Sequence, residues 1–327
     1  MPSTTHRILI TEPIPEKAID FLKQHGEVTV GEKGTYQNQE HLIRDIKGYD
    51  ALLCMLSNPV NKRVLEAADR LKIVANFAVG YDNIDVETAH ELGIKVANTP
   101  DVLTEACGDY AMGLLMALSR KFNEAEAYLR EGNFTGWEPL GFLGMELRNK
   151  TLGIIGMGRI GQAFARRARA FGMQIKYHNR SRINPEIEKE LEATYIADHY
   201  ELARQSDVLS LNCPLTEETH HLVDRNLLEI MPEHALLVNI SRGAVIDEAE
   251  LAKALKEEVI VGAALDVFEN EPEVNPELLK TPNTLLLPHI ASATHETREA
   301  IGMLAAQAIA DILEGKLASE VPNLIRP

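Results

Sequence analysis

The sequence predicts an α/β protein with two doubly wound domains, each built on a parallel sheet covered by helices on both faces. Two observations predict this fold class. Short apolar runs that suit buried strands alternate with helix-type apolar patterns along most of the chain. A glycine-rich turn, GMGRIG at residues 156–161, stands between one such run and a helix-type pattern. With 327 residues, the chain is long enough to form a core in each of two domains.

Composition argues against several classes of protein. The chain is 45% hydrophobic and 25% charged, which is ordinary for a globular protein. Its net charge of −16 argues against nucleic acid or an anionic membrane as the main partner, so a small anionic substrate would need a local basic pocket. The apolar run at 111–118 is too short to span a bilayer, and the first residues carry no cleavable apolar signal.

The cysteines Cys54, Cys107 and Cys213 have no metal-ligand spacing and leave an odd thiol. This pattern is typical of a reducing compartment, so we expect a cytoplasmic protein. Each cysteine lies in apolar surroundings in the sequence, which favours an inert core thiol over a nucleophile.

The N-terminal part of the chain predicts the smaller domain, which closes near Asn98. Its apolar runs predict five parallel strands at Arg7–Thr11, Glu27–Val30, Ala51–Cys54, Ile73–Asn76 and Lys95–Ala97. The patterns between the strands predict helices at Pro15–His25, Gln39–Ile46, Asn61–Ala68 and Val86–Leu92.

A long helical pattern begins at Thr104 and runs to about Arg130. Such a helix can bridge two domains. The loop after it, residues 132–144, is rich in glycine and aromatic residues and contains the single tryptophan, Trp137. Leaving a tryptophan exposed in the loop of a monomer is costly, so Trp137 either packs against another subunit or lines a cleft between the domains.

Residues 150–182 predict one βαβ half of a Rossmann-type, dinucleotide-binding fold. The expected elements are a strand at Thr151–Ile155, the glycine turn, a helix at Gln162–Phe171 and a second strand at Met173–Tyr177. Gly156 allows a sharp bend, Gly158 allows the backbone to approach a pyrophosphate, and Gly161 allows the helix to pack closely on the sheet. The free N–H groups at the start of the helix would then face the phosphates.

The residues after the second strand indicate which cofactor is bound. An NAD-specific fold usually has Asp or Glu about 20 residues beyond the glycines, to bind the ribose 2′-hydroxyl. Here the chain has no acid, and the residues in that place are His178, Asn179, Arg180, Ser181 and Arg182. Because guanidinium groups and a hydroxyl suit a 2′-phosphate, we expect NADP(H) as the preferred cofactor and NAD(H) as the alternative.

The rest of the chain completes the second domain and returns to the first. Further strands are expected at Val208–Asn212, Ala235–Asn239, Val259–Ala264 and Thr284–Leu287. A final helix is expected from Thr294 to Leu313, and the tail at Leu317–Pro327 should pack back on the first domain. We therefore expect a discontinuous, flavodoxin-like, substrate-binding domain at 1–102 and 296–327, and a dinucleotide-binding Rossmann domain at 103–295, with a cleft between them.

Three polar residues, Arg242, Glu271 and His289, stand just after expected strands of the second sheet, where open α/β sheets place their active sites. Arg242 can grip a carboxylate with its planar fork. No other metal ligand is spaced near His289, so we expect no metal site. Taken alone, a lone histidine is more often structural, and a lone glutamate is more often a solvated surface charge.

Six motifs, in order and over nearly the whole chain, make the sequence similar to the D-isomer-specific 2-hydroxyacid dehydrogenase family. They are VGYDNID (Val79–Asp85), NTPDVLTEA (Asn98–Ala106), GMGRIG, NISRGAVID (Asn239–Asp247), ALDVFENEP (Ala264–Pro272) and PHIASATHETR (Pro288–Arg298). The segment GWEPLGFLG at 136–144, together with VGYDNID and the arginines after the second strand, most resembles the glyoxylate and hydroxypyruvate reductase branch.

The resemblance implies roles for individual residues. It assigns catalysis to Arg242, Glu271 and His289, with backbone N–H groups of Val79 and Gly80 holding a substrate carboxylate. Asp266 would contact the nicotinamide amide. The expected substrate-binding set is Leu56, Val79, Gly80, Arg242 and His289. The expected cofactor-binding set is Thr104, Gly156, Gly158, Arg159, Ile160, Gly161, Asn179, Arg180, Ser181, Arg182, Cys213, Pro214, Thr219, Ile240, Ser241, Arg242, Asp266 and His289.

The implied reaction is reduction of a small 2-oxoacid to the D-2-hydroxyacid by hydride transfer. His289 would donate a proton to the carbonyl oxygen, Glu271 would hold the ring and favour its charged form, and Arg242 would bind the carboxylate. Glyoxylate, hydroxypyruvate and 2-ketogluconate stay open as substrates. The family's usual pairing through the segment after Thr104 also implies a homodimer.

Two other functions are compatible with the resemblance. A phosphite-oxidising relative shares the GW-P segment and a methionine like Met55, but would be expected to carry a lysine where this chain has Val79. Corepressors of the same family use the fold as a nucleotide-sensing binding module. The complete set of Arg242, Glu271 and His289 favours an enzyme.

Overall fold

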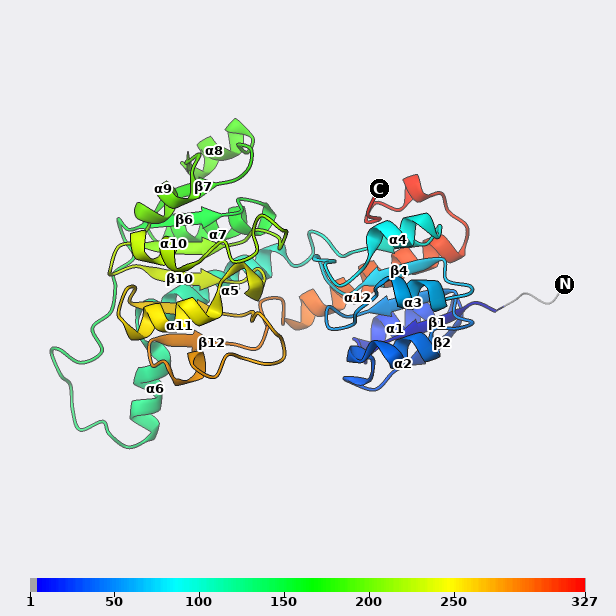
Figure 1. Ribbon diagram of the computed structural model, residues 1–327, viewed down its shortest axis with the longest axis horizontal. Helices are drawn as coiled ribbons and strands as arrows, with labels where there is room; N and C mark the ends of the chain where they lie inside the picture. Colours follow the sequence, from blue (N-terminus) through cyan, green and yellow to red (C-terminus); the bar gives the residue numbers. More distant parts are fainter. Residues whose placement is uncertain (1–4, 327) are drawn as a thin grey trace. The chain divides into compact units, whose positions relative to one another are not determined.

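The computed structural model describes residues 5–326, which divide into two units (Figure 1). The first unit holds the described residues up to Leu103 and those from Ala293 onward, and the second runs from Thr104 to Ser292. Both units are built on parallel sheets with helices, so the predicted α/β class with two doubly wound domains is confirmed. Which unit binds cofactor and which binds substrate stays a prediction.

The sheet of the first unit has the order β2-β1-β3-β4-β5, and every ladder in it is parallel. This is the flavodoxin-like order, which reverses between β1 and β3. The strands are β1 (Arg7–Ile10), β2 (Glu27–Val30), β3 (Ala51–Cys54), β4 (Ile73–Asn76) and β5 (Lys95–Ala97). The helices are α1 (Glu16–Leu22), α2 (Gln39–Asp45), α3 (Lys62–Ala67), α4 (Val86–Glu91) and α12 (His295–Leu313), with short 3-10 turns η1 (Thr35–Gln37) and η4 (Ala318–Glu320).

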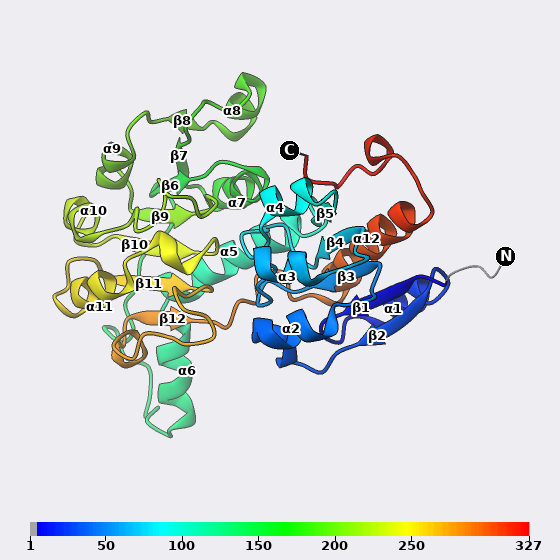
Figure 2. The same cartoon turned by 45° about the vertical axis from the view of Figure 1, so that its right-hand side comes forward.

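The C-terminal part of the chain completes this first unit. Helix α12 begins after Thr294, whose hydroxyl accepts a hydrogen bond from the N–H of Thr297, and it packs beside α1, β3 and β4 (Figure 2). The tail then reaches the edge strand β5, where the N–H of Ile325 donates to the carbonyl of Val96 at 2.8 Å. The predicted return of the tail to the first sheet is confirmed for the residues up to 326.

The sheet of the second unit has the order β12-β11-β10-β9-β6-β7-β8 and is also parallel throughout its ladders. It is the Rossmann order, which reverses between β6 and β9. The strands are β6 (Thr151–Ile155), β7 (Gln174–His178), β8 (Thr194–Tyr195), β9 (Val208–Leu211), β10 (Leu236–Asn239), β11 (Gly262–Leu265) and β12 (Thr284–Leu286).

Helices cover both faces of this second sheet. They are α5 (Thr104–Ser119), α6 (Phe122–Arg130), α7 (Arg159–Ala170), α8 (Pro185–Leu191), α9 (His199–Arg204), α10 (Arg225–Ile230) and α11 (Glu248–Lys256), with 3-10 turns η2 (Gly243–Val245) and η3 (Leu278–Lys280). One buried cluster joins α5 and α7 to the sheet, and a second joins α9, α10 and α11 to it. Gly108 of α5 makes the first cluster tight, because a Cβ there would lie 2.8 Å from the Cβ of Ala163 on α7.

Several sequence-based boundaries are wrong. The helix expected from Gln162 begins at Arg159, and the helix expected to end at His25 ends at Leu22. The long helix expected from Thr104 to about Arg130 breaks into α5 and α6 at Lys121, whose backbone is left-handed with φ of 54°. The strand expected from Val259 begins only at Gly262, and the short edge strand β8 has no pattern that predicts it. Helix α6 buries none of its residues and, with the loop after it, extends beyond the sheet of its unit (Figure 1).

Within residues 5–326, no helix combines the length and the apolar character that crossing a bilayer requires.

Candidate active site

The predicted substrate-binding residues of the first unit lie on two loops that follow the neighbouring strands β3 and β4. Leu56 lies on the first loop, and Val79 and Gly80 lie on the second. Asn83 joins the loops, because its amide nitrogen donates to the carbonyls of Met55 at 3.0 Å and Asn58 at 3.1 Å. The structure therefore brings the three predicted residues to one edge of the sheet, as parallel strands require.

Amide side chains fix the backbone of Val79 and Gly80. Asn98 donates to the carbonyl of Val79 at 2.7 Å, and Asn76, which is fully buried, donates to the carbonyl of Gly80 at 2.7 Å. The protein thus engages both carbonyls. The N–H groups of Val79 and Gly80, in contrast, make no hydrogen bond to another of residues 5–326. The sequence alone does not predict the part played by these asparagines, although Asn83 and Asn98 stand inside the motifs VGYDNID and NTPDVLTEA.

The glycine turn after β6 has the geometry that a dinucleotide requires. Gly156 has a left-handed φ of 95°, and a Cβ there would lie 2.5 Å from the backbone nitrogen of Cys213. A Cβ on Gly161 would lie 2.5 Å from the carbonyl oxygen of Gly156, so only glycine allows α7 to start this close to the strand. A Cβ on Gly158 would meet no atom within 4 Å, which leaves open space in front of α7.

Two further observations show that this turn fits a dinucleotide. Gly158, the N-cap of α7, offers no side chain to the first N–H groups of the helix. The side-chain oxygen of Asn212, beside the turn, is buried and has no hydrogen-bond partner among the described residues. Arg159 and Ile160 form the first turn of this helix. The residues present therefore fit a phosphate-bearing group at the switch point of the sheet.

The four residues after β7 do not behave alike. Asn179 accepts a hydrogen bond from the N–H of Met157 at 2.7 Å and so ties β7 to the glycine turn. Arg180 and Ser181 are exposed. Arg182 is exposed too, but its fork pairs with the Glu188 carboxylate at 2.8 and 3.1 Å, and this pairing lowers the pKa of Glu188. A carboxylate partner in the protein competes with any phosphate for Arg182, a difference from Arg180 that the sequence does not predict.

The turn after β9 holds three predicted cofactor contacts. Cys213 is buried, and burial raises the pKa of its thiol to about 11. Pro214 is exposed, and the hydroxyl of Thr219 donates to its carbonyl at 2.7 Å, which closes the turn. Cys54 and Cys107 are buried as well, and burial raises the pKa of the Cys54 thiol to about 12. None of the three cysteines forms a disulfide, and the thiols of Cys54 and Cys213 stay protonated near neutral pH, as expected of inert core cysteines.

A buried asparagine shapes the turn that presents Arg242. Asn239, at the end of β10, accepts hydrogen bonds from the N–H and hydroxyl of Ser241 and donates to the carbonyl of Arg242 at 2.9 Å. Ile240 lies between them. Gly243 then packs against the loop after β11, since a Cβ there would lie 1.8 Å from the carbonyl carbon of Phe268. The turn with Arg242 and the loop with Glu271 are therefore in direct contact.

Glu271 and His289 meet as predicted. The Nδ1 atom of His289 lies 2.9 Å from the Oε2 atom of Glu271, and the side chains are 31% and 38% exposed, so both can be reached from solvent. Burial raises the pKa of the Glu271 carboxyl, but contact with His289, the N–H of Phe268 and the charge of Arg242 together lower it below its ordinary value. Glu271 is thus an anion near neutral pH, next to the histidine and near the arginine.

Asp266, which the resemblance places at the nicotinamide amide, is enclosed by hydrogen-bond donors of the protein. Its side chain is fully buried, and the carboxylate accepts hydrogen bonds from the hydroxyl of Tyr110 and from the backbone N–H groups of Ile290 and Ala291. Thr104, another predicted cofactor contact, begins the helix that carries Tyr110. A contact between Asp266 and the cofactor stays a prediction.

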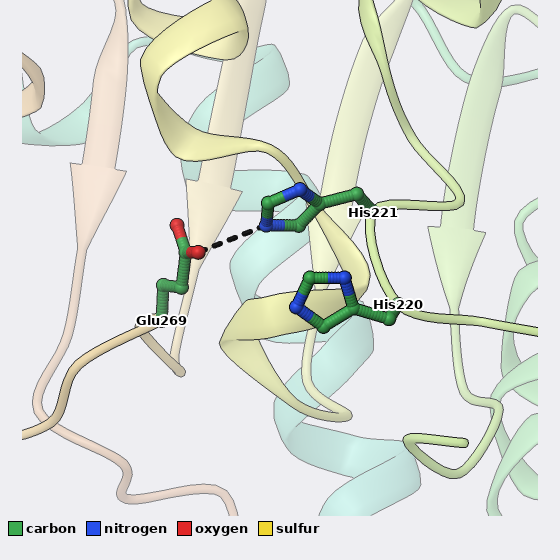
Figure 3. A group of neighbouring side chains, drawn as sticks. All are labelled: His220, His221 and Glu269. Carbon is green, nitrogen blue, oxygen red and sulfur yellow. Dashed lines mark hydrogen bonds and ion pairs between the residues drawn. The ribbon is translucent and has the colours of Figure 1, made fainter. Parts of the chain in front are cut away.

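Three residues with the chemistry of metal ligands lie together beside the loop of Glu271: His220, His221 and Glu269 (Figure 3). The Nε2 atom of His221 lies 2.8 Å from the Oε1 atom of Glu269, and its Nδ1 atom faces Asp247 at 3.9 Å. The ring of His220 stacks on that of His221 at 4.0 Å between centroids. The hydrogen bond between His221 and Glu269 ties two loops and accounts for their closeness, and the expected absence of a metal stays a prediction.

Comparisons with known proteins agree with this geometry. Residues 112–291 match the model for the NAD-binding domain of D-isomer-specific 2-hydroxyacid dehydrogenases. A glyoxylate reductase of Thermococcus litoralis is 46% identical over 98% of this chain and 96% of its own length, and one of Thermococcus kodakarensis is 47% identical over 97% and 96%.

Solved structures show the same fold over the whole chain. A protein of Thermus thermophilus has a TM-score of 0.91 and 39% identity, covering 98% of this chain and 100% of that one. An NADPH-dependent glyoxylate/hydroxypyruvate reductase of Sinorhizobium meliloti, in complex with NADP and malonate, has a TM-score of 0.87 and 36% identity, covering 99% and 100%. The resemblance of the six motifs is thereby confirmed, and the chain belongs to the D-isomer-specific 2-hydroxyacid dehydrogenase family.

Proposed function

We propose that this protein is an NADP(H)-dependent glyoxylate/hydroxypyruvate reductase, which reduces a small 2-oxoacid to the D-2-hydroxyacid. The observation that carries the proposal is the hydrogen bond between His289 and Glu271 beside the turn of Arg242, on loops that follow neighbouring strands of one sheet. Relatives named glyoxylate reductase that match nearly the full chain support the same activity. 2-Ketogluconate is a third candidate substrate.

The residues divide the chemistry among them. Bound cofactor supplies a hydride to the carbonyl carbon of the oxoacid. His289, as imidazolium, gives its proton to the carbonyl oxygen, and Glu271 keeps the ring oriented and charged. Arg242 binds the substrate carboxylate and stabilises the charge that develops on the carbonyl oxygen. The N–H groups of Val79 and Gly80 take the other carboxylate oxygen, and Leu56 lines the same loop pair.

Preference for NADP(H) is the finer part of the proposal. Arg180, exposed beside the glycine turn, is the main ligand that we propose for the 2′-phosphate, with Ser181 adding a hydroxyl. Arg182 contributes less because Glu188 already engages its fork. NAD(H) is the alternative cofactor.

We also propose a homodimer, which pairs through the segment after α5. In a single chain Trp137 is 85% exposed, and Phe134, Leu140 and Leu143 of the same loop are exposed as well. An apolar patch of this kind usually marks a protein interface. Sedimentation that finds only a species of the chain mass, 36.3 kDa, at micromolar concentration contradicts the dimer. We also propose a cytoplasmic setting, which the odd number of cysteines in the sequence supports.

A panel of substrates tests the activity. Glyoxylate, hydroxypyruvate and 2-ketogluconate are each supplied with NADPH or NADH, and cofactor oxidation is followed by absorbance. Steady turnover of at least one oxoacid, faster with NADPH, is the expected result. Cofactor binding without turnover would instead indicate a nucleotide-sensing module, and cofactor reduction with phosphite would indicate the phosphite-oxidising alternative.

A further inference from the structure

The backbone of His289 has an unusual conformation, which contacts with neighbouring residues must stabilise. Its φ of 52° is left-handed, a conformation that is strained for a residue with a side chain. The residue lies between β12 and α12, outside any regular element. The direction of the imidazole depends on this turn. A residue that stabilises the turn therefore also fixes the orientation of the ring.

Asp266 is the residue that holds the turn. Its backbone carbonyl accepts the N–H of His289 at 2.8 Å, and its carboxylate accepts the next two N–H groups, those of Ile290 and Ala291, at 2.9 Å each. Asp266 follows β11, whose neighbour β12 leads to His289, so the parallel pairing brings the two residues side by side. Its own N–H donates to the carbonyl of Asn239, which shapes the turn of Arg242.

A carboxylate that is fully buried needs donors to offset its loss of hydration. Besides the two backbone N–H groups, the one side-chain donor to Asp266 within residues 5–326 is the hydroxyl of Tyr110, at 2.6 Å. Tyr110 comes from α5, 156 residues earlier in the chain. Burial raises the pKa of Asp266, while the bonds from Tyr110 and from Ile290 and Ala291 act in the opposite direction. The hydroxyl therefore helps to keep the acceptor of the turn ionised and fixed.

We propose that Tyr110 is a positioning residue for His289 and acts through Asp266. The hydroxyl orients the carboxylate, the carboxylate holds the N–H groups of Ile290 and Ala291, and the turn aims the imidazole. Neither the proposed reaction nor the family motifs assign a part to Tyr110. The expected effect of Tyr110 on the rate of oxoacid reduction rests on the proposed function. Its expected effect on the stability of the backbone around His289 does not.

Tyr110→Phe removes only the hydroxyl and tests the inference with two readouts. The turnover number for oxoacid reduction should fall about tenfold, which is less than the roughly 100-fold cost of misplacing a reacting group by 1 Å. The dissociation constant for NADPH should change less than about twofold, since binding of the cofactor does not need a proton donor. Amide hydrogen exchange in a peptide spanning 286–292 should become about tenfold faster.

Tyr36→Phe is the matched control. Its hydroxyl also donates to a carboxylate, Asp45 at 3.3 Å, but in the other unit, so it should leave both readouts unchanged. In an Asp266→Asn background, Tyr110→Phe should have almost no further effect, because its route to His289 is already lost. Additive losses, or unchanged exchange at 286–292 in Tyr110→Phe, would overturn the inference. If the wild type turns over no oxoacid but Tyr110→Phe still speeds exchange at 286–292, the proposed function is rejected. The link between Tyr110 and the backbone around His289 is then kept.

Discussion

Both sheets are parallel and doubly wound, yet the loops at their carboxyl ends differ in chemistry. In the first unit, neutral amides donate to backbone carbonyls and so fix the backbone around Leu56, Val79 and Gly80. In the second unit, ionisable side chains contact one another, and His289 pairs with Glu271 near Arg242. The first edge therefore offers a rigid backbone surface, and the second offers groups that can move protons and bind charge.

The difference predicts which kinetic parameter changes when residues at each edge are substituted. An amide that ties loops together affects how well a substrate is held, and it carries no charge that depends on pH. An ionisable group affects turnover and the pH at which turnover occurs. Substitutions in the first unit should therefore change KM for the oxoacid, and substitutions in the second should change kcat, cofactor choice or pH profile.

The largest effect is expected at His289. His289→Asn removes the proton donor but keeps a small polar side chain, so turnover should fall by ~10²–10⁴, the usual contribution of a positioned acid. Steady-state rates in both directions measure the loss. Titration of the variant with NADPH shows whether it still binds the cofactor, so that a loss of turnover can be separated from a loss of binding. Near-normal turnover in the variant would mean that His289 is structural.

Arg180 tests whether charge in the second unit also selects the cofactor. Arg180→Asp should reverse the preference from NADPH toward NADH by at least tenfold, since each charge-assisted contact is worth ~1.5–3 kcal/mol. The ratio of kcat/KM for the two cofactors is the measurement. Arg182→Ala is the matched comparison and should have the smaller effect, because Glu188 already binds its fork. A larger effect at Arg182 would reverse our ranking of the two arginines.

In the first unit, Asn83→Ala should loosen the two substrate loops. KM for the oxoacid should rise about tenfold while kcat changes by less than about threefold, the pattern of lost uniform binding. The pH profile should stay the same. Asn283→Ala is the control, because Asn283 also donates to a backbone carbonyl, that of Val261 at 2.7 Å, but belongs to the second unit and to neither of these loops. A fall in kcat alone would remove the distinction between the two edges.

The local sequence pattern predicts those structural features that depend on residues close together in the chain. The strands β2, β3, β4 and β5 have the predicted bounds because each is a short run between turn residues. The break at Lys121 escapes prediction, since lysine suits a helix and only the packing of the chain forces its left-handed backbone. Arg242, Glu271 and His289 could be proposed as catalytic from motifs. A part for Tyr110 could not, because its partner lies 156 residues away and nothing local marks the pair.

The smallest effect is expected from Glu271→Gln, which keeps the shape of the side chain and removes its charge. Because the pKa of Glu271 is lowered, the carboxylate is ionised throughout the neutral range and loses its charge only as pH falls through that lowered value. Reduction needs a protonated imidazole, so its rate is full at lower pH and falls as pH rises. Oxidation of the hydroxyacid needs the neutral ring and rises over the same range.

A neutral amide in place of Glu271 no longer stabilises the charged ring. Both limbs of the pH profile should therefore move to lower pH, with the affinity for NADPH nearly unchanged. Rates of reduction and oxidation across a range of pH values measure the shift. Glu269→Gln is the matched control, because this carboxylate pairs with His221 rather than His289. If the limbs stay in place in Glu271→Gln, the carboxylate orients the ring without stabilising its charge. Glu271 would then act as the amides of the first unit do, by fixing the position of a neighbouring group.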